Sequence, residues 1–363
     1  MLQTVAVRGY RSLREVILPL RQLSIITGAN GVGKSSLYRA LRLLADCGRG
    51  EVIGSLAREG GLQSVLWAGP EQLKGARRSQ TVEGTVRTRP ISLEMGFAAD
   101  DFGYLVDLGM PQSAGPSVFV RDPEIKREVV FAGPVLRPSA TLVRRSRAFA
   151  EAVNADNGFT ELSRSLPLYR SVLAEYAHPH ALPEVAAVRE RLRGWRFYDG
   201  FRVDDGSDLA AAVQTILESG SDDLSRVVAE AFDGATVSVA IHDGLFDLQL
   251  HQRGMLRPLR AAELSDGTLR FLLWAAALLS PDAPSLMVLN EPETSLHPDL
   301  VRPLASLIRA AAARTQLVVV THSRALLEQS AGAVEVELYK DWGETRITGQ
   351  DLLSTPRWDW GKR

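Results

Sequence analysis

The chain has 363 residues, of which 45% are hydrophobic and 23% are charged, as is ordinary for a protein with a core of its own. A formal net charge of -1 argues against a globally basic nucleic-acid coat but leaves local basic patches open. The single cysteine, Cys47, excludes a disulfide framework. The longest apolar run, Phe271 to Leu279, is shorter than the ~20 residues that a membrane span needs. Because the chain also opens directly on a strand pattern, we expect no membrane span and a cytoplasmic location.

The first predicted elements are strands that lead into a glycine-rich loop. Strand patterns cover Thr4 to Val7, Val16 to Leu18 and Leu23 to Thr27. The loop that follows fits G-x-x-x-x-G-K-[ST] and consists of Gly28, Ala29, Asn30, Gly31, Val32, Gly33, Lys34, Ser35 and Ser36. A helical pattern runs from Leu37 to Leu44. A strand, this loop and a helix in that order are the context in which the motif, the P-loop, cradles phosphate.

The residue types of the loop suit a nucleotide. Its glycines let the backbone N–H groups face inward around a polyanion, and the following helix adds its positive dipole end. Lys34 can place an ammonium on the outer phosphates, and the Ser35 hydroxyl can ligate Mg²⁺. The alternative is a glycine-rich turn that matches by chance, which the flanking strand and helix make the weaker interpretation.

The middle of the chain is predicted to be a β region followed by helices. Residues 82–97 and 103–108 alternate apolar and polar side chains, as in an antiparallel sheet, and the pattern resumes over 117–131. Helical periodicity follows at 142–153, 161–176, 184–195 and 209–218. Strand patterns return at 235–241 and 245–251, with a turn at Asp243-Gly244. These changes divide the chain into an N-terminal lobe (1–136), a helical insert (137–234) and a C-terminal lobe (235–363).

Arginines gather at a few places in the first two thirds of the chain. The clusters are Arg77 and Arg78; Arg144, Arg145 and Arg147; and Arg189, Arg191, Arg193 and Arg196. Taken singly, each is typical of a solvated face. They are also compatible with contacts to nucleic-acid phosphates, and the sequence leaves both interpretations open.

Three later segments carry further polar residues at element ends. Ser265 and Gly267 stand at the start of a helix that runs to Leu279, where a hydroxyl, free N–H groups and a dipole could meet an anion, although Ser265 could equally be a plain N-cap. Two apolar strands, 285–289 and 316–321, end in Asn290-Glu291-Pro292-Glu293 and in His322, as strands of α/β folds do beside ligands. A lone histidine is usually structural, but at the tip of a core strand it is a candidate for touching the γ-phosphate. Residues 333–348 read as a closing hairpin, and Trp358 and Trp360 as packing anchors.

The order of these motifs resembles the ABC-type ATPase heads of the SMC and RecF-like class, and within it the short bacterial AAA-family ATPases. The matching stretches are the P-loop, Leu264 to Thr268, Glu291 to Glu293, Ser295 to Pro298, Thr321 to Ser323, and less closely Gly9 to Leu13 and Asp205 to Ala210. They cover roughly residues 1–45 and 200–340. The resemblance implies an α/β P-loop NTPase of ABC-ATPase type, with a mainly parallel core sheet, an antiparallel β lobe and a helical insert.

The resemblance also implies roles for residues. ATP and Mg²⁺ are the expected cofactors, with Ser35 and Asn290 at the metal, Glu291 as the general base and His322 as the switch histidine. Ser265 and Gly267 belong to the signature, which contacts the nucleotide bound by another subunit. A chain with one P-loop and one signature then needs a second copy, so a homodimer with ATP at its interface is expected.

One position departs from the family pattern. Asn290 stands where the family has the aspartate that holds Mg²⁺; it keeps an acceptor oxygen but loses the charge, so it should bind the metal more weakly. Losing a neighbouring anion should also lower the pKa of Glu291 and make it a poorer base. The sequence therefore favours a slow ATPase. The metal-sensing glutamine of the family has no clear counterpart, and Gln112 is one guess.

Three functions remain open. The leading hypothesis is an ATP-driven switch in DNA repair or genome defence, with DNA as a possible partner. The alternative, motivated by Asn290, is a very slow or non-enzymatic ATP-binding regulator of a separately encoded effector protein. A transporter ATPase subunit is disfavoured by Asp266 in the signature, by the run from Glu291 to Pro298 and by the long insert.

Overall fold

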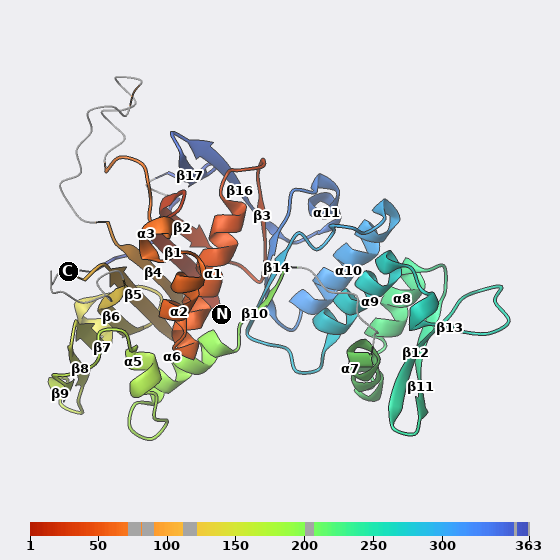
Figure 1. The fold of residues 1–363 in the computed structure, drawn as a ribbon, viewed down its shortest axis with the longest axis horizontal. Helices are drawn as coiled ribbons and strands as arrows, with labels where there is room; N and C mark the ends of the chain where they lie inside the picture. Colours follow the sequence, from red (N-terminus) through yellow and green to blue (C-terminus); the bar gives the residue numbers. More distant parts are fainter. Residues whose placement is uncertain (72–80, 82–90, 112–121, 200–206, 352–353, 362–363) are drawn as a thin grey trace. The chain divides into compact units, whose positions relative to one another are not determined.

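The computed structural model (Figure 1) describes residues 1–71, 81, 91–111, 122–199, 207–351 and 354–361. Several residues named in the sequence analysis lie outside these ranges: Arg77, Arg78, the predicted strand residues 82–90 and 117–121, Gln112, Asp205 and Gly206. The chain forms two compact units, and each is considered by itself. The first comprises Met1–Leu20, Gly28–Trp195 and Val336–Arg363, and the second comprises Arg21–Thr27 and Arg196–Glu335.

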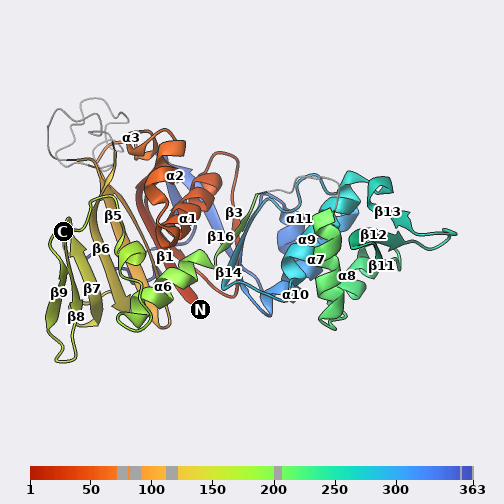
Figure 2. The ribbon, with the colours of Figure 1, turned by 60° about the horizontal axis from the view of Figure 1, so that its bottom comes forward.

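The first unit is built on an eight-stranded antiparallel sheet with the order β2-β1-β4-β5-β6-β7-β8-β9. Figure 2 shows its strands β5 to β9 side by side. Its strands are β1 (Leu2–Tyr10), β2 (Leu13–Pro19), β4 (Leu93–Ala99), β5 (Phe102–Gly109), β6 (Glu124–Ala132), β7 (Thr141–Ser146), β8 (Phe149–Val153) and β9 (Phe159–Ser163). The helices of this unit are α1 (Lys34–Arg49), α2 (Val52–Arg58), α3 (Leu62–Val65), η2 (Pro138–Ala140), α5 (Val172–Glu175) and α6 (Pro183–Arg193). Strand β4 is buried along its whole length. Helices α1 and α6 pack on the sheet, and Trp358 and Trp360 pack against Phe131 and its neighbours, which confirms both tryptophans as packing anchors.

The second unit contains the parallel strands, in the order β10-β14-β15-β3. These are β10 (Arg196–Tyr198), β14 (Leu286–Asn290), β15 (Gln316–Val320) and β3 (Leu23–Thr27). The helices are α7 (Ser207–Glu218), α8 (Asp223–Ala231), η3 (Ala261–Glu263), α9 (Asp266–Leu279), η4 (Pro298–Leu300), α10 (Val301–Ala312) and α11 (Arg324–Gln329). They share one apolar core with the parallel strands. The buried aliphatic strands β14 and β15 are of the kind expected for a parallel sheet covered by helices.

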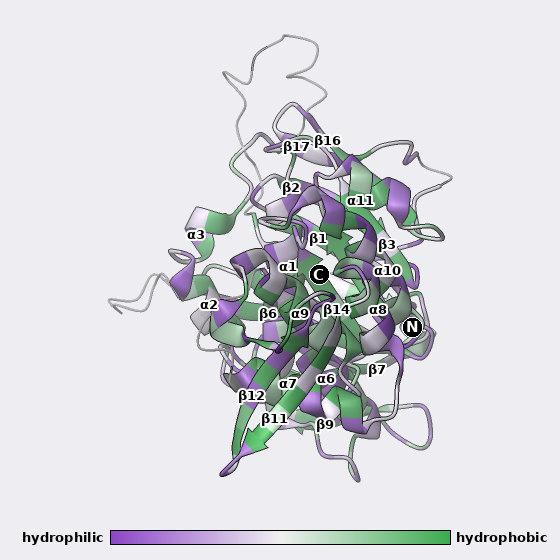
Figure 3. Cartoon of the chain, turned by 90° about the vertical axis from the view of Figure 1, so that its right-hand side faces the viewer, coloured by the Kyte–Doolittle hydropathy of each residue, from purple (hydrophilic) through white to green (hydrophobic). Residues whose placement is uncertain are grey.

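Two hairpins occur where the sequence predicts them. Strands β11 (Thr236–His242) and β12 (Leu245–His251) pair antiparallel and extend to β13 (Leu259–Arg260). Asp243 and Gly244 at the turn both have positive φ, as a tight hairpin turn requires. The hydrophobic end of β11 (Figure 3) carries Ile241, which pairs with Phe246 and is 53% exposed. At the end of the chain, β16 (Val334–Asp341) pairs antiparallel with β17 (Glu344–Ile347).

The prediction of a helical insert is wrong for part of its length. Residues 142–153, expected to be helical, form strands β7 and β8, and 161–176 begins in β9 and contains the one-turn helix α5. The physical reason is Arg145, which is buried in β7 and paired with Glu128. Because a charged residue occupies this core position, the alternation of apolar and polar residues that is typical of a strand is not visible in the sequence. The helices expected at 184–195 and 209–218 are confirmed as α6 and α7.

The proportion of parallel to antiparallel strands also differs from the expectation. The mainly parallel arrangement describes the strands of the second unit, whereas the largest sheet among the described residues is antiparallel and continues through β9. The division at 1–136, 137–234 and 235–363 stays a prediction about domains, and the two compact units have other bounds. No helix in the described ranges is long and apolar enough to cross a membrane.

Candidate functional site

The P-loop follows β3 and ends where α1 begins. Gly28, Gly31 and Gly33 have φ of 136°, 78° and 115°, a region that residues with a side chain rarely adopt. Two of them also lack room for one: a Cβ on Gly28 would lie 2.3 Å from the Leu338 carbonyl oxygen, and on Gly33 2.1 Å from Thr345 Oγ1. Glycine is therefore required at 28 and 33 by conformation and by packing, and at Gly31, which has open space around it, by conformation alone.

The start of α1 and Lys34 together form an anion site. Gly33 caps the helix without a side-chain bond, and the first intrahelical bond runs from the Leu37 N–H to the Gly33 carbonyl, so the N–H groups of the first turn are available to an anion. Lys34 is buried, and its Nζ donates to the carbonyls of Gly28 at 2.6 Å and Ala29 at 3.1 Å. An ammonium has three donors, so these contacts leave one N–H for a ligand. Ser35 is exposed on the same turn.

In the second unit, three side chains meet where β14 and β15 end. Glu291 has a φ of 50°, and its N–H donates to the Val320 carbonyl at 2.7 Å, so a left-handed residue turns the chain immediately after Asn290. His322 Nδ1 lies 3.5 Å from Glu291 Oε1 and 3.9 Å from Glu293 Oε1. The sequence-predicted Asn290, Glu291 and His322 are therefore neighbours within one unit. A left-handed glutamate is strained, and such strain occurs at functional sites.

Glu293 is a residue of this cluster to which the sequence reading assigned no role. Its side chain is 8% exposed. Oε1 accepts a hydrogen bond from Thr321 Oγ1, while Oε2 is buried without a hydrogen-bond partner among the described residues. A buried polar atom of this kind calls for an explanation such as an ion or a water. The signal in the sequence was the second carboxylate of Glu-Pro-Glu, whose burial a strand-end pattern does not reveal.

The oxygen donors at the end of β14 fit a hard cation. The Asn290 amide and the buried Glu293 oxygen are of the type that Mg²⁺ takes. Within the described ranges, no cluster of three or more His, Cys, Asp or Glu residues could hold a metal by itself. Mg²⁺ commonly takes one or two protein oxygens and completes its coordination with waters and substrate phosphates.

Ser265 caps helix α9. Its Oγ accepts from the Thr268 N–H at 3.2 Å and lies 2.9 Å from Thr268 Oγ1, so the plain N-cap alternative is observed. A Cβ on Gly267 would come no closer than 4.0 Å to Ser265 Oγ and to the Ser295 carbonyl oxygen. Gly267 is half-buried, and a Cβ there would make ordinary contacts with these two atoms without a clash. The contact of Ser265 and Gly267 with a partner's nucleotide stays a prediction.

The described arginine clusters are largely paired with acidic residues. Arg144 pairs with Glu151 and Arg147 approaches Glu124 at 3.8 Å. Arg145 is fully buried with Glu128, and Arg191 pairs with Asp101 at 2.7 Å. These pairs serve the fold, and Arg145 is not on the solvated face that the sequence predicts, because it is buried.

A family model described as "AAA domain, putative AbiEii toxin, Type IV TA system" matches residues 23–328. Curated proteins gave no match. Among solved structures, the SMC head bound to the C-winged helix domain of ScpA aligns with a TM-score of 0.51 and 14% identity, over 97% of this chain and 98% of that one.

Two further SMC heads align less well. The SMC head domain from Thermotoga maritima has a TM-score of 0.46 at 14% identity, over 97% of this chain and 99% of that chain. The SMC head with an extended coiled coil bound to the C-terminal domain of ScpA derived from Pyrococcus furiosus has 0.49 at 12% identity, over 96% and 95%. At 14% identity, the alignment with the ScpA-bound SMC head speaks for the fold alone.

The fold and the family agree with the resemblance seen in the motifs. The first alignment covers nearly the whole chain and confirms an SMC-head type of P-loop fold. The family model spans the P-loop, the signature-like segment, Glu291 and His322. The chain therefore belongs to the AAA-domain family described as putative AbiEii toxin, type IV TA system, and within the P-loop ATPases it has the fold of the SMC and RecF-like heads.

Proposed function

We propose that this protein binds ATP with Mg²⁺ at its P-loop and hydrolyses it slowly. The observation that carries the proposal is the loop itself, with three left-handed glycines, a buried Lys34 ammonium and the open N-terminus of α1 around one point. This combination is a phosphate cradle. Membership of an AAA-domain family supports the same conclusion.

The catalytic roles follow from the residues at the strand ends. In this proposal Glu291 is the general base for the attacking water. His322, whose Nδ1 lies 3.5 Å from Glu291 Oε1, would hold that carboxylate and contact the γ-phosphate. Ser35 and Asn290 would hold the metal, and the buried oxygen of Glu293 would be a further acceptor near Asn290. When bound, Mg²⁺ neutralises charge on the phosphate oxygens. Because Asn290 carries no charge, we expect weak metal binding and slow turnover.

The nucleotide site is proposed to be completed by a second copy. Ser265 and Gly267 of one chain would contact the nucleotide on the P-loop of its partner, so that ATP joins two copies and hydrolysis releases them. An isologous pair of this kind has two equivalent sites. The exposed Ser265 beside Gly267 is compatible with such an approach.

We place this switch in genome defence or DNA repair, in the cytoplasm. The family description, which names a putative toxin and a type IV TA system, supports defence and an effector. DNA contact is the least supported part, because the described arginines are largely paired. The second candidate is an ATP-binding regulator of a separate effector protein with negligible turnover, and the uncharged Asn290 is the observation that favours it.

Replacing Lys34 by alanine is expected to weaken ATP binding by about 100-fold, because charge-assisted hydrogen bonds to the phosphates are lost. Equilibrium dialysis with ATP and Mg²⁺ measures this. The matched control is Arg39→Ala, which removes an exposed positive charge from the same helix and should leave the affinity unchanged. Equal affinities of the wild type and Lys34→Ala would reject the P-loop as the nucleotide site.

A further inference from the structure

The C-terminal hairpin contacts the P-loop within the first unit. Thr345 of β17 is 1% exposed, and its Oγ1 donates to the Val32 carbonyl at 2.6 Å and lies 2.8 Å from Ser12 Oγ. Lys340 Nζ of β16 donates to the Gly31 carbonyl at 3.2 Å. Two consecutive carbonyls of the P-loop are thus held by side chains more than 300 positions away in the sequence.

Because the peptide bond is planar, the contacts to these carbonyls also fix the direction of the neighbouring amide N–H groups. In a trans peptide the C=O and the next N–H point in opposite directions. A carbonyl of Val32 that is held on the hairpin side therefore turns the Gly33 N–H to the other side of the loop. The same holds for the Gly31 carbonyl and the Val32 N–H. The hairpin side is closed to a ligand, because a Cβ on Gly33 would already collide with Thr345 Oγ1.

Hydrogen-bond counting assigns the direction of each bond. A threonine hydroxyl has one proton, and the Val32 carbonyl can only accept, so Thr345 gives its proton to Val32. The Ser12 hydroxyl must then donate to Thr345 Oγ1. This makes a chain of bonds from Ser12 through Thr345 to Val32, and the Thr345 N–H bonds in addition to the Ser12 carbonyl at 2.8 Å.

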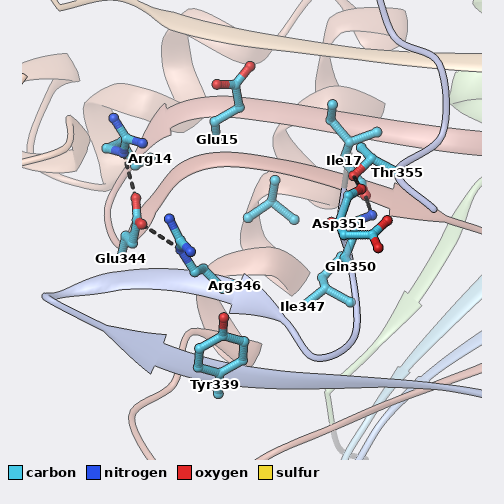
Figure 4. A pocket seen from close by; sticks show the side chains of 11 residues that line it. Arg14, Glu15, Ile17, Tyr339, Glu344, Arg346, Ile347, Gln350, Asp351 and Thr355 are labelled. Atoms are coloured by element: carbon cyan, nitrogen blue, oxygen red, sulfur yellow. Dashed lines mark hydrogen bonds and ion pairs between the residues drawn. The ribbon is translucent and has the colours of Figure 1, made fainter. Parts of the chain in front are cut away.

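The opposite face of β17 keeps Thr345 turned toward the loop. Successive side chains of a strand point to opposite faces, so Glu344 and Arg346 face away from Thr345, into a pocket of about 520 Å³ beside β2 (Figure 4). There Glu344 accepts from Arg14 at 2.5 Å and from Arg346 at 2.6 Å. Burial acts to raise the pKa of Glu344, but these two arginines hold it below its usual value, so the pairs are charged and fix the strand.

We propose that Thr345 is a positioning residue for nucleotide binding: it holds the Val32 carbonyl so that the Gly33 amide is aimed at the polyphosphate. Lys340 acts in the same way, more weakly, on the Gly31 carbonyl. This inference rests on the proposed function of the P-loop. The ligand is the triphosphate part of a nucleotide, because backbone amides recognise phosphate oxygens and not the base.

Thr345→Val tests the proposal, since valine has a similar shape but no hydroxyl. Thr345→Ser keeps the hydroxyl, and Thr348→Val makes the same change at an exposed position on the same hairpin. Affinities for ATP and for inorganic tripolyphosphate are measured well below the unfolding temperature of each variant. We expect Thr345→Val to weaken the affinities for ATP and for tripolyphosphate by about tenfold, which is the expected effect of losing one hydrogen bond. The affinities of Thr345→Ser and Thr348→Val should stay within about twofold of the wild-type values.

The outcomes separate this inference from the proposed function. Equal affinities of the wild type and Thr345→Val would overturn the positioning role even if the melting temperature falls, because the hydroxyl would then serve stability alone. An equal loss in Thr345→Ser would also overturn it, since packing of the methyl group would be responsible. A wild type that binds neither ligand would reject the proposed function, and this inference with it.

Discussion

Glu291→Gln is expected to lower ATP turnover by at least about 100-fold while leaving ATP binding intact, because an amide cannot take a proton from water. The left-handed backbone at Glu291 places this side chain, and glutamine preserves its shape. Phosphate release under saturating ATP and Mg²⁺ measures the effect. Glu328→Gln, an exposed change on α11, is the matched control and should have the wild-type rate.

The companion variant Asn290→Asp should act in the opposite direction. A carboxylate at the end of β14 would bind Mg²⁺ more strongly than the uncharged Asn290 amide. Stronger metal binding predicts faster phosphate release than in the wild type. Equal background rates in the wild type and Glu291→Gln would reject the enzyme and leave the ATP-binding regulator as the better account.

Glu128→Gln is expected to lower the free energy of unfolding by about 3–5 kcal/mol, because it leaves a buried guanidinium without its carboxylate. Glu128 is 1% exposed and accepts from Arg145 at 2.8 Å, Tyr104 at 2.7 Å and the Val172 N–H at 2.9 Å. Burial and the nearby Glu128 charge raise the pKa of Tyr104, which keeps its hydroxyl protonated as a donor. The cluster joins β5, β6 and β7 to the start of α5.

Urea denaturation followed by circular dichroism measures this loss. Glu151→Gln is the matched control, because Glu151 pairs with Arg144, whose side chain is 55% exposed, and such pairs contribute about 1 kcal/mol or less. A Glu128→Gln variant as stable as Glu151→Gln would show that the buried pair does not hold these strands together.

The part of the fold that local patterns determine could be predicted from the sequence. The P-loop needs a strand, glycines and a helix in immediate succession, and all three are found between Leu23 and Arg49. The parallel strands β14 and β15 are continuous apolar runs. The prediction of a helix over residues 142–153 is wrong because Arg145 is buried in an ion pair with Glu128. A hydrophobicity pattern treats an arginine as exposed, so it cannot reveal a charge that is buried against a distant partner.

The site was predictable to a similar degree. Asn290, Glu291 and His322 were placed together because the ends of parallel strands meet at one edge of a sheet. The buried oxygen of Glu293 and the hydroxyl of Thr345 could not be foreseen, because each depends on contacts made only after folding. Thr345 lies 313 positions from Val32, and no spacing rule connects them.

The central claim, a nucleotide site shared by two copies, is tested most directly by mixing two inactive variants. Lys34→Ala removes the phosphate contact. Gly267→Glu adds a carboxylate where a new Cβ clashes with neither Ser265 Oγ nor the Ser295 carbonyl oxygen but where a partner's nucleotide would lie. In a heterodimer, the intact P-loop of the Gly267→Glu chain meets the intact signature of the Lys34→Ala chain. Random pairing in an equal mixture should restore about a quarter of the wild-type ATP turnover. A mixture no more active than the sum of its two components would contradict the shared site.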